Sequence, residues 1–332
     1  METVPQTFSV TSAVELATVE RGGFVESRHA GAAIVLDADG TVARQLGDVS
    51  ALIFPRSTLK PIQALACLTA GAPLEGVQLG LATASHSGTD AHVAVVRSIL
   101  EAAELGEDDL GCPPDWPGDR ATRDEMVREH YSAARVRMNC SGKHAAMLLT
   151  CKTAGWDPTT YLDPVHPLQV QIRELTERLS GERVAATAID GCGAPVHAIS
   201  LSGLAKAVQR IGTSSPTSPF ALHRSAGHLV QAVRDNPWTI AGPGRDDTVI
   251  MERLGVFSKV GAEGVHIMVA PGGTTVALKT LDGSSRASAA VGLRLLELAG
   301  ALDPAAVADT VERLPLTVYG GGQDVGRIRP AF

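Results

Sequence analysis

Apolar and polar residues alternate along the start of the chain, which is the pattern of β-strands with one buried face. The alternation covers residues 14–20, and two further apolar runs follow at 32–36 and 42–46. The turn between those two runs, Asp-Ala-Asp-Gly at 37–40, is typical of a β-hairpin. The N-terminal part is therefore predicted to be a β-meander.

The C-terminal part returns to the same pattern. Apolar runs at 265–270 and 275–280 flank the turn sequence Pro-Gly-Gly-Thr at 271–274, and a helix is predicted over 287–299. Both ends of the chain thus predict strands that can pair in one antiparallel sheet.

The middle of the chain has helical spacing instead. A helix opens at Ser57, carries Pro61 in its first turn and stops at Gly71, and Thr89 caps a second helix. Further helices are predicted over residues 145–154, 163–179, 201–211, 224–234 and 249–254. Residues 106–119 indicate a surface loop, and the apolar run 184–189 predicts a buried strand.

This order predicts an α/β fold of the α+β kind. Strands from about residues 14–50 and 256–332 form an antiparallel sheet, and residues 57–255 form a helical lobe. We expect a single domain over 1–332. A cleft between a sheet and such a lobe is a usual place for a binding site.

Composition narrows the function classes. The 332 residues are 44% hydrophobic and 20% charged, which suits a globular protein with a sizeable core. The net charge is −7 and no basic run is present, so neither a nucleic-acid surface nor an anionic membrane surface is expected. No apolar stretch is long enough to span a bilayer and the start lacks a signal-peptide pattern, so we expect a cytoplasmic protein. Its five cysteines are then free thiols, metal ligands or reactive groups.

The first candidate for chemistry is Ser57-x-x-Lys60. Residues three apart at a helix start share one face, so a hydroxyl lies beside an amine. A desolvated lysine can accept the serine proton, and the pattern is the nucleophile motif of β-lactamases and penicillin-binding proteins. Arg56, directly before the serine, is suited to hold a carboxylate.

Two further turns add similar groups. Ser85-His86-Ser87-Gly88 offers a second hydroxyl after an apolar run, and Lys259-Val260-Gly261 is similar to the Lys-Thr-Gly element beside the active serine of β-lactamase-like proteins. We favour Ser85 over Ser87 because it directly follows the apolar run. A histidine such as His86 in this place is more often a hydrogen-bonding partner than the catalyst.

Cysteines mark the remaining turns. Cys140 and Lys143 lie one helical turn apart, and Cys192 follows Asp190 and Gly191 in a glycine-rich turn. Cysteines in tight turns suggest a metal, although two thiolates and a lysine are an unusual zinc set. From these residues alone, a metal site, buried structural thiols, a disulfide and a nucleophile all stay open. Asp190 is suited to hold a substrate ammonium group or simply to form the turn.

Together these segments resemble the rhizobial-type, class 3 L-asparaginases, often labelled asparaginase II. The resemblance covers most of the chain, in residues 14–15 with 21–27, 56–61, 84–88, 139–144, 190–195 and 259–264. That family is unrelated to the bacterial-type and plant-type asparaginases.

The resemblance implies a fold similar to that of serine β-lactamases and glutaminases, and hydrolysis of L-asparagine to L-aspartate and ammonia by a homodimer. It implies two catalytic Ser-Lys tandems, which map to Ser57 with Lys60 and Ser85 with Lys259. It implies a Zn²⁺ held by Cys140, Lys143, Cys192 and water. The substrate-binding residues are expected to be Arg56, Asp190, His86 and Gly191.

We expect Ser57, activated by Lys60, to attack the side-chain amide, with Ser85 and Lys259 relaying protons or supplying the second step. The zinc is expected mainly to orient the substrate. Which serine is the nucleophile, and whether zinc is needed, stays open. The alternatives are a glutaminase or a penicillin-recognising serine hydrolase on the same fold, or a non-catalytic zinc or amino-acid binding protein. The presence of both Ser-Lys pairs argues against a non-catalytic binding protein, which would not need them. A β-lactamase is expected to be exported, and the lack of an export signal argues against that function.

Overall fold

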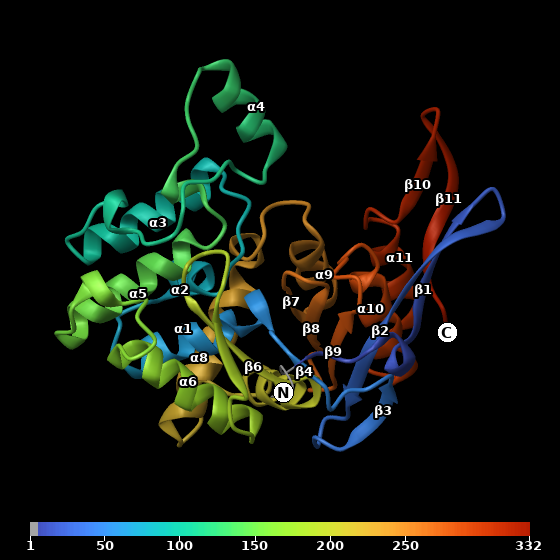
Figure 1. The fold of residues 1–332 in the computed structure, drawn as a ribbon, viewed down its shortest axis with the longest axis horizontal. Coiled ribbons are helices and arrows are strands. Elements are labelled where there is room, and N and C mark those ends of the chain that lie inside the picture. Colours follow the sequence, from blue (N-terminus) through green and yellow to red (C-terminus); the bar gives the residue numbers. More distant parts are fainter. Residues whose placement is uncertain (1–5) are drawn as a thin grey trace, which may run out of the picture.

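The computed structural model describes residues 6–332 and has an α+β fold, in which a large antiparallel sheet stands beside a lobe of helices (Figure 1). The strands come from the two ends of the chain, coloured blue and orange to red, and the middle of the chain forms the lobe. The predicted arrangement of a sheet from both ends and a helical lobe is confirmed.

Within residues 6–332 the large sheet has eight strands in the order β10-β11-β1-β2-β9-β8-β7, with β3 paired to β2. The strands are β1 Val14–Arg21, β2 Phe24–Leu36, β3 Val42–Leu46, β7 Phe257–Val260, β8 Val265–Val269, β9 Thr275–Thr280, β10 Thr317–Gly320 and β11 Gln323–Pro330. Neighbouring strands are antiparallel, and the pairing of β2 with β9 sets Ile34 opposite Ala277. This pair joins the N-terminal meander to the C-terminal strands.

Both faces of this sheet are covered by helices. α7 (Leu201–Gly212) packs on β2 and β9 from the lobe, and α10 (Ser288–Leu298) packs on β8 and β9. Successive side chains of a strand point to opposite faces. Accordingly, Ile34 belongs to the core shared with the lobe and Val35 to the core under α10. The central strands are therefore apolar on both sides.

The lobe is built around one buried helix, α5, which packs against α1, α2 and α3. Residues 141–151 of α5 are all buried, so this helix has no polar face. The other helices are α1 Lys60–Thr69, α2 Gly76–Ala82, α3 Asp90–Ala102, α4 Arg120–Arg128, α5 Ser141–Ala154, α6 Pro167–Ser180, α8 Ala221–Asp235 and α9 Asp246–Leu254, with α11 Pro304–Val311 near the C-terminus. A 3₁₀ turn, η2 Arg56–Leu59, precedes α1.

A second, three-stranded sheet lies within the lobe region, in the order β4-β6-β5. Its strands are β4 Leu52–Ile53, β5 Ala186–Ile189 and β6 Pro195–Ser200. The prediction of a buried strand at 184–189 is wrong in its burial, since most of β5 is exposed and Ile189 is 78% exposed. β5 is an edge strand that pairs only with β6, so one side of it meets solvent.

Several helices also differ from prediction. α2, α4 and α11 were not predicted, and α5 and α9 begin at Ser141 and Asp246, before their predicted starts at 145 and 249. α6 begins at Pro167 with His166 as its N-cap, four residues after the predicted start at Asp163. α4 was not predicted, because only Met126 of its residues is buried and no apolar stripe marks it in the sequence. Between residues 6 and 332, no helix is long and apolar enough to cross a membrane.

Candidate active site

The Ser85 hydroxyl lies between two buried lysine amines. Lys60 Nζ, at the start of α1, donates to Ser85 Oγ at 2.8 Å and also to the Ala84 carbonyl. Lys259 Nζ, on β7, donates to the same Ser85 Oγ at 3.0 Å. The Ser85 N–H is held by the Ile240 carbonyl at 2.9 Å, which fixes the residue after the end of α2. Three segments that are distant in the sequence thus meet at one oxygen.

The two lysines are each only 2% exposed, which places two amines in a poorly solvated space. Burial lowers the pKa of Lys259 to about 7; the carboxylate of Asp247 opposes this and the nearby Lys60 adds to it. Near neutral pH a substantial fraction of Lys259 is therefore uncharged. A neutral amine beside a hydroxyl can accept its proton.

Ser57 lies on η2, three residues before Lys60, and η2 packs against the strand that carries Lys259. The side chain of Ser57 is half-buried, and within residues 6–332 its hydroxyl has no hydrogen-bond partner. Lys60 directs its Nζ to Ser85 instead, so within residues 6–332 no hydrogen bond joins the Ser57 and Lys60 side chains. A half-buried hydroxyl without a protein partner is free to hydrogen-bond a ligand.

The turn that carries Ser57 is strained and tightly packed. Arg56 has a φ of 54°, a left-handed backbone that costs a non-glycine residue about 1–2 kcal/mol. η2 packs against β7 and β8, and a Cβ on Gly261 would lie 3.0 Å from the Pro55 carbonyl oxygen. Glycine at 261 therefore lets the segment after Lys259 approach the Ser57 turn.

A charged pair stands at the other side of Ser57. Arg56 Nε donates to Asp190 Oδ1 at 2.7 Å, and the Gly191 N–H donates to the same oxygen at 2.8 Å. Arg56 also lies 3.8 Å from the Glu263 carboxylate. A pocket of about 250 Å³ borders Arg56 and Glu263, so the guanidinium of Arg56 is reached from outside. A guanidinium and a carboxylate side by side can bind the carboxylate and ammonium of an α-amino acid.

The remaining residues of the Ser85 turn point elsewhere. Ser87 packs against Gly242, and within residues 6–332 it makes no hydrogen bond to either lysine. His86 is buried, its Nε2 lies 2.9 Å from Ser141 Oγ, and its Nδ1 accepts the Gly88 N–H at 3.1 Å. Burial, with the charges of His92 and Lys60, holds the pKa of His86 well below its usual value. His86 is therefore a neutral ring that ties the Ser85 turn to α5.

The two predicted cysteines and the predicted lysine also come together. Lys143 Nζ donates to Cys192 Sγ at 3.0 Å. The Cys192 thiol donates a hydrogen bond to Cys140, and this bond lowers the pKa of Cys140. Burial opposes the shift, but the charges of Lys60 and Lys143 add to it, so the pKa of Cys140 lies well below its usual range. Burial lowers and the two sulfurs raise the pKa of Lys143, and the net direction is upward.

This trio fits a thiophilic metal. Two sulfurs with one a ready thiolate are ligands that zinc prefers. His144 Nε2, which is close to Cys192, is a buried nitrogen without a hydrogen-bond partner among residues 6–332, so the surroundings are polar as well. In that described part of the chain no group of three or more His, Cys, Asp and Glu side chains could hold a metal. Lys143, bonded to Cys192, is the third protein group at this place.

One carboxylate beside Lys259 was not singled out from the sequence. Asp247 is 1% exposed and accepts the Val260 N–H at 2.9 Å. In the sequence it is one of two aspartates at the start of a helix, where carboxylates are common. Only the packing of α9 on β7 shows that it faces the site.

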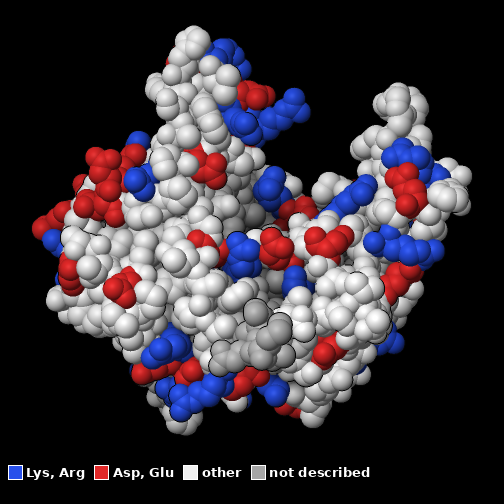
Figure 2. Space-filling view, viewed as in Figure 1, with Lys and Arg blue, Asp and Glu red and all other residues white. Residues whose placement is uncertain are grey.

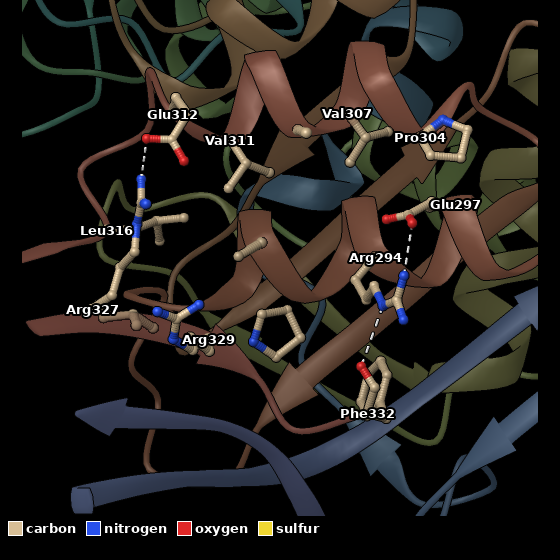
Figure 3. A pocket seen from close by; sticks show the side chains of 14 residues that line it. Arg294, Glu297, Pro304, Val307, Val311, Glu312, Leu316, Arg327, Arg329 and Phe332 are labelled. Carbon is tan, nitrogen blue, oxygen red and sulfur yellow. Dashed lines mark hydrogen bonds and ion pairs between the residues drawn. The ribbon is translucent and has the colours of Figure 1, made fainter. Parts of the chain in front are cut away.

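One further pocket has a different lining. Figure 3 shows a pocket of about 390 Å³ between α10, α11 and β11, whose arginines Arg294 and Arg327 pair with Glu297 and Glu312. No serine, cysteine, lysine or histidine lines it. In Figure 2 the surface is notched between the α4 arm and the β10–β11 hairpin, with charged side chains of both signs along the floor.

Comparison of the chain with known protein families gives a match. The model of the family described as L-asparaginase II matches residues 17–330. No curated protein matches the chain. Among solved structures, Mglu in its native form is 13% identical, with a TM-score of 0.44 over 80% of this chain and 63% of that one. The chain thus spans less than two thirds of the length of Mglu. Bacillus glutaminase is also 13% identical, with a TM-score of 0.37 over 82% of this chain and 91% of that one.

Proposed function

Because the chain belongs to the L-asparaginase II family, we propose that it is an amidohydrolase that converts L-asparagine to L-aspartate and ammonia through a serine nucleophile. The observation that carries the proposal is the Ser85 hydroxyl held by two buried lysine amines, 2.8 and 3.0 Å away. Such a cluster has little structural value, since burying two amines side by side costs stability. Ser57 lies on the turn η2, which leads into Lys60 and packs against the strand of Lys259.

In the first step Ser57 Oγ attacks the amide carbon of the substrate. Its proton passes to the amine cluster of Lys60 and Lys259, which Ser85 connects. The C–N bond then breaks as the cluster protonates the leaving nitrogen, and ammonia departs from an acyl-serine. In the second step water attacks the acyl carbon, gives its proton to the cluster, and aspartate leaves with Ser57 restored.

Charge on the carbonyl oxygen needs donors during both steps. η2 begins at Arg56, so the N–H of Ser57 is among the first of a helical turn and is not used by it. A backbone N–H at this place is suited to stabilise an oxyanion. The left-handed Arg56 is part of what aims this turn.

The α-amino acid end of the substrate is assigned to the charged pair. The Arg56 guanidinium binds the α-carboxylate and the Asp190 carboxylate binds the α-ammonium, so the substrate replaces the contact between them. Gly191, which donates its N–H to Asp190, keeps that carboxylate in place. His86 acts through Ser85 rather than on the substrate.

Cys140, Lys143 and Cys192 would hold a Zn²⁺ ion. When bound, the ion would supply a fixed positive charge and an open position near the substrate end of the site, and so help orient the ligand. Lys143 must give up its proton to serve as a ligand, which favours binding at higher pH. A homodimer, which the family resemblance implies, belongs to the same proposal, and light scattering on the purified protein tests it.

The test of the function is ammonia release by the purified protein from asparagine and, in parallel, from glutamine, with nitrocefin cleavage as a third assay. Turnover of asparagine well above the other two supports the proposal. Preferred turnover of glutamine or nitrocefin replaces it with a glutaminase or a penicillin-recognising hydrolase. Binding of asparagine without turnover makes the protein a binder.

A further inference from the structure

Asp247 is a carboxylate buried directly behind the Lys259 strand. Its Oδ1 accepts the Ser258 hydroxyl at 2.7 Å, and its Oδ2 accepts the Val260 N–H at 2.9 Å. Ser258 and Val260 are the residues on either side of Lys259, so one side chain of α9 holds the strand at both neighbours of the lysine.

The strand needs this support because β7 is at the edge of the sheet. β8 pairs with one side of β7, and the sheet order leaves the other side without a strand. An unpaired backbone N–H on an edge strand needs another acceptor when it is buried. Asp247 provides it next to Lys259, and this keeps Lys259 Nζ within 3.0 Å of Ser85 Oγ.

The carboxylate is itself fixed from a third direction. His266 Nε2, on β8, lies 3.1 Å from Asp247 Oδ1 and 2.9 Å from Ser258 Oγ, and His266 Nδ1 lies 3.0 Å from Ser288 Oγ. Burial raises the pKa of Asp247. This effect is outweighed by the hydrogen bond and charge of His266, the charge of Lys259 and the Val260 N–H, which all lower the pKa, so Asp247 is an anion at neutral pH.

The charged groups around Lys259 come from three elements. Lys60 faces it from α1, Asp247 from α9, and the Cys140 thiol from the turn before α5. Around Asp247 the charged or titratable groups are Lys259 on β7, His266 on β8 and Asp246 on its own helix. Asp247 is thus the carboxylate that opposes the effect of burial and of Lys60 on Lys259.

We infer that Asp247 is the positioning residue of Lys259: it fixes β7 on both sides of the lysine and supplies the negative charge that the amine faces. The role in turnover rests on the proposed function. Asp247 does not contact Ser57, Ser85 or the Arg56–Asp190 pair, so it acts on catalysis through Lys259.

The test is Asp247→Asn, which keeps the shape and removes the charge. The asparagine oxygen can accept the Val260 N–H while its amide NH₂ donates to Ser258 and His266. The chain has six lysines, so ¹⁵N labelling of lysine allows the Lys259 signal to be followed by NMR, with Lys259→Met assigning it. We expect the pKa of Lys259 to fall by about one unit or more. The acid limb of the asparagine pH profile should move to lower pH by the same amount, with KM little changed.

Asp246→Asn is the matched control. It removes the same charge from the adjacent position, but Asp246 bonds neither Ser258 nor Val260, and its effect on Lys259 should be much smaller. An unchanged Lys259 titration in Asp247→Asn, or an equal shift in both variants, overturns the inference. The NMR titration decides this even if the protein releases no ammonia from asparagine, in which case the proposed function alone has failed.

Ser258→Ala is the second variant, for the case in which Asp247→Asn does not fold. It removes one of the two clamps on the strand and keeps the charge. We expect kcat to fall at least about threefold without a change in KM, because one typical hydrogen bond contributes on the order of 1 kcal/mol. An unchanged kcat contradicts the positioning role.

Discussion

Lys60 and Lys259 share one acceptor, the hydroxyl of Ser85. Two ammonium groups at one oxygen repel each other, so the cluster releases a proton more easily than a single exposed lysine does. The same residue-scale arrangement leaves Ser57 without a partner and therefore available to a substrate.

The first prediction concerns pH. Lys259, with a pKa of about 7, accepts a proton only in its neutral form, so kcat/KM should rise with pH through about 7 and level off above it. Below that pH the amine is protonated and activity is lost. A steady-state profile measured with asparagine in constant-ionic-strength buffers checks this. A profile that is flat between pH 6 and 8 contradicts the role of Lys259.

The second prediction separates the two serines. Ser57→Ala should lower kcat at least about 1,000-fold, since it removes the nucleophile. Ser85→Ala should also lower kcat, but the variant should still form an acyl-enzyme on Ser57. Mass spectrometry after reaction with a diazoketone analogue of asparagine locates the label. A label on Ser85 in the parent protein would exchange the roles of the two serines.

At the scale of elements, the site depends on the close approach of η2 to the segment after β7. A Cβ at Gly261 meets the Pro55 carbonyl at 3.0 Å and Thr58 at 3.0 Å, both of them in the turn that carries Ser57. The chain must therefore have no side chain at 261 if Ser57 and Lys259 are to stay together.

The third prediction follows from this contact. Gly261→Ala should lower kcat about 10- to 100-fold, because displacement of a catalytic group by a fraction of an ångström or more misaligns it. Gly272→Ala is the matched control, as a Cβ there meets nothing within 4 Å. Circular dichroism should show both variants folded. Equal kcat in the two variants would mean that the approach at 261 is not limiting.

At the scale of the whole molecule, the site joins parts of the chain that no local segment could bring together. Cys140 precedes α5 and Cys192 lies in the turn between β5 and β6. Lys143, on α5, donates a hydrogen bond to Cys192. A metal bound by all three ties the centre of the lobe to the small sheet. A metal that binds the folded state but not the unfolded state raises the stability of the fold.

The fourth prediction is therefore that the purified protein contains about one zinc ion per chain. Removing the zinc with a chelator should lower the Tm by several degrees, because a ligand at 100 times its Kd stabilises the folded state by about 2.7 kcal/mol. Cys192→Ser should lose most of the metal and raise KM for asparagine. Cys151→Ala, which removes another buried thiol of α5, should keep the metal. Elemental analysis and calorimetry measure both, and metal-free protein with an unchanged Tm after zinc addition would falsify the zinc site.

By itself the sequence determined the strands of the N-terminal meander, the strands β8 and β9 and most of the long helices, since side-chain periods of two and of 3.6 are local properties of the chain. It also pointed to the residue types of the site, because Ser, Lys and Cys in glycine-marked turns stand out against an aliphatic background. The sequence missed the polar helix α4, which has no apolar stripe, and it misjudged the burial of β5, whose apolar run lies at the exposed edge of the small sheet.

Only the tertiary structure decided which of these groups meet. Lys259 and Ser85 are 174 positions apart, and Lys60 and Ser85 are 25 apart, so no local period relates them. The side chain of Lys60 is long enough to pass its own turn, and packing of α1 against α2 chose Ser85 over Ser57 as its partner. Asp247 was hidden for the same reason, because a carboxylate at a helix start acquires its role only when that helix is packed on the edge strand that carries Lys259.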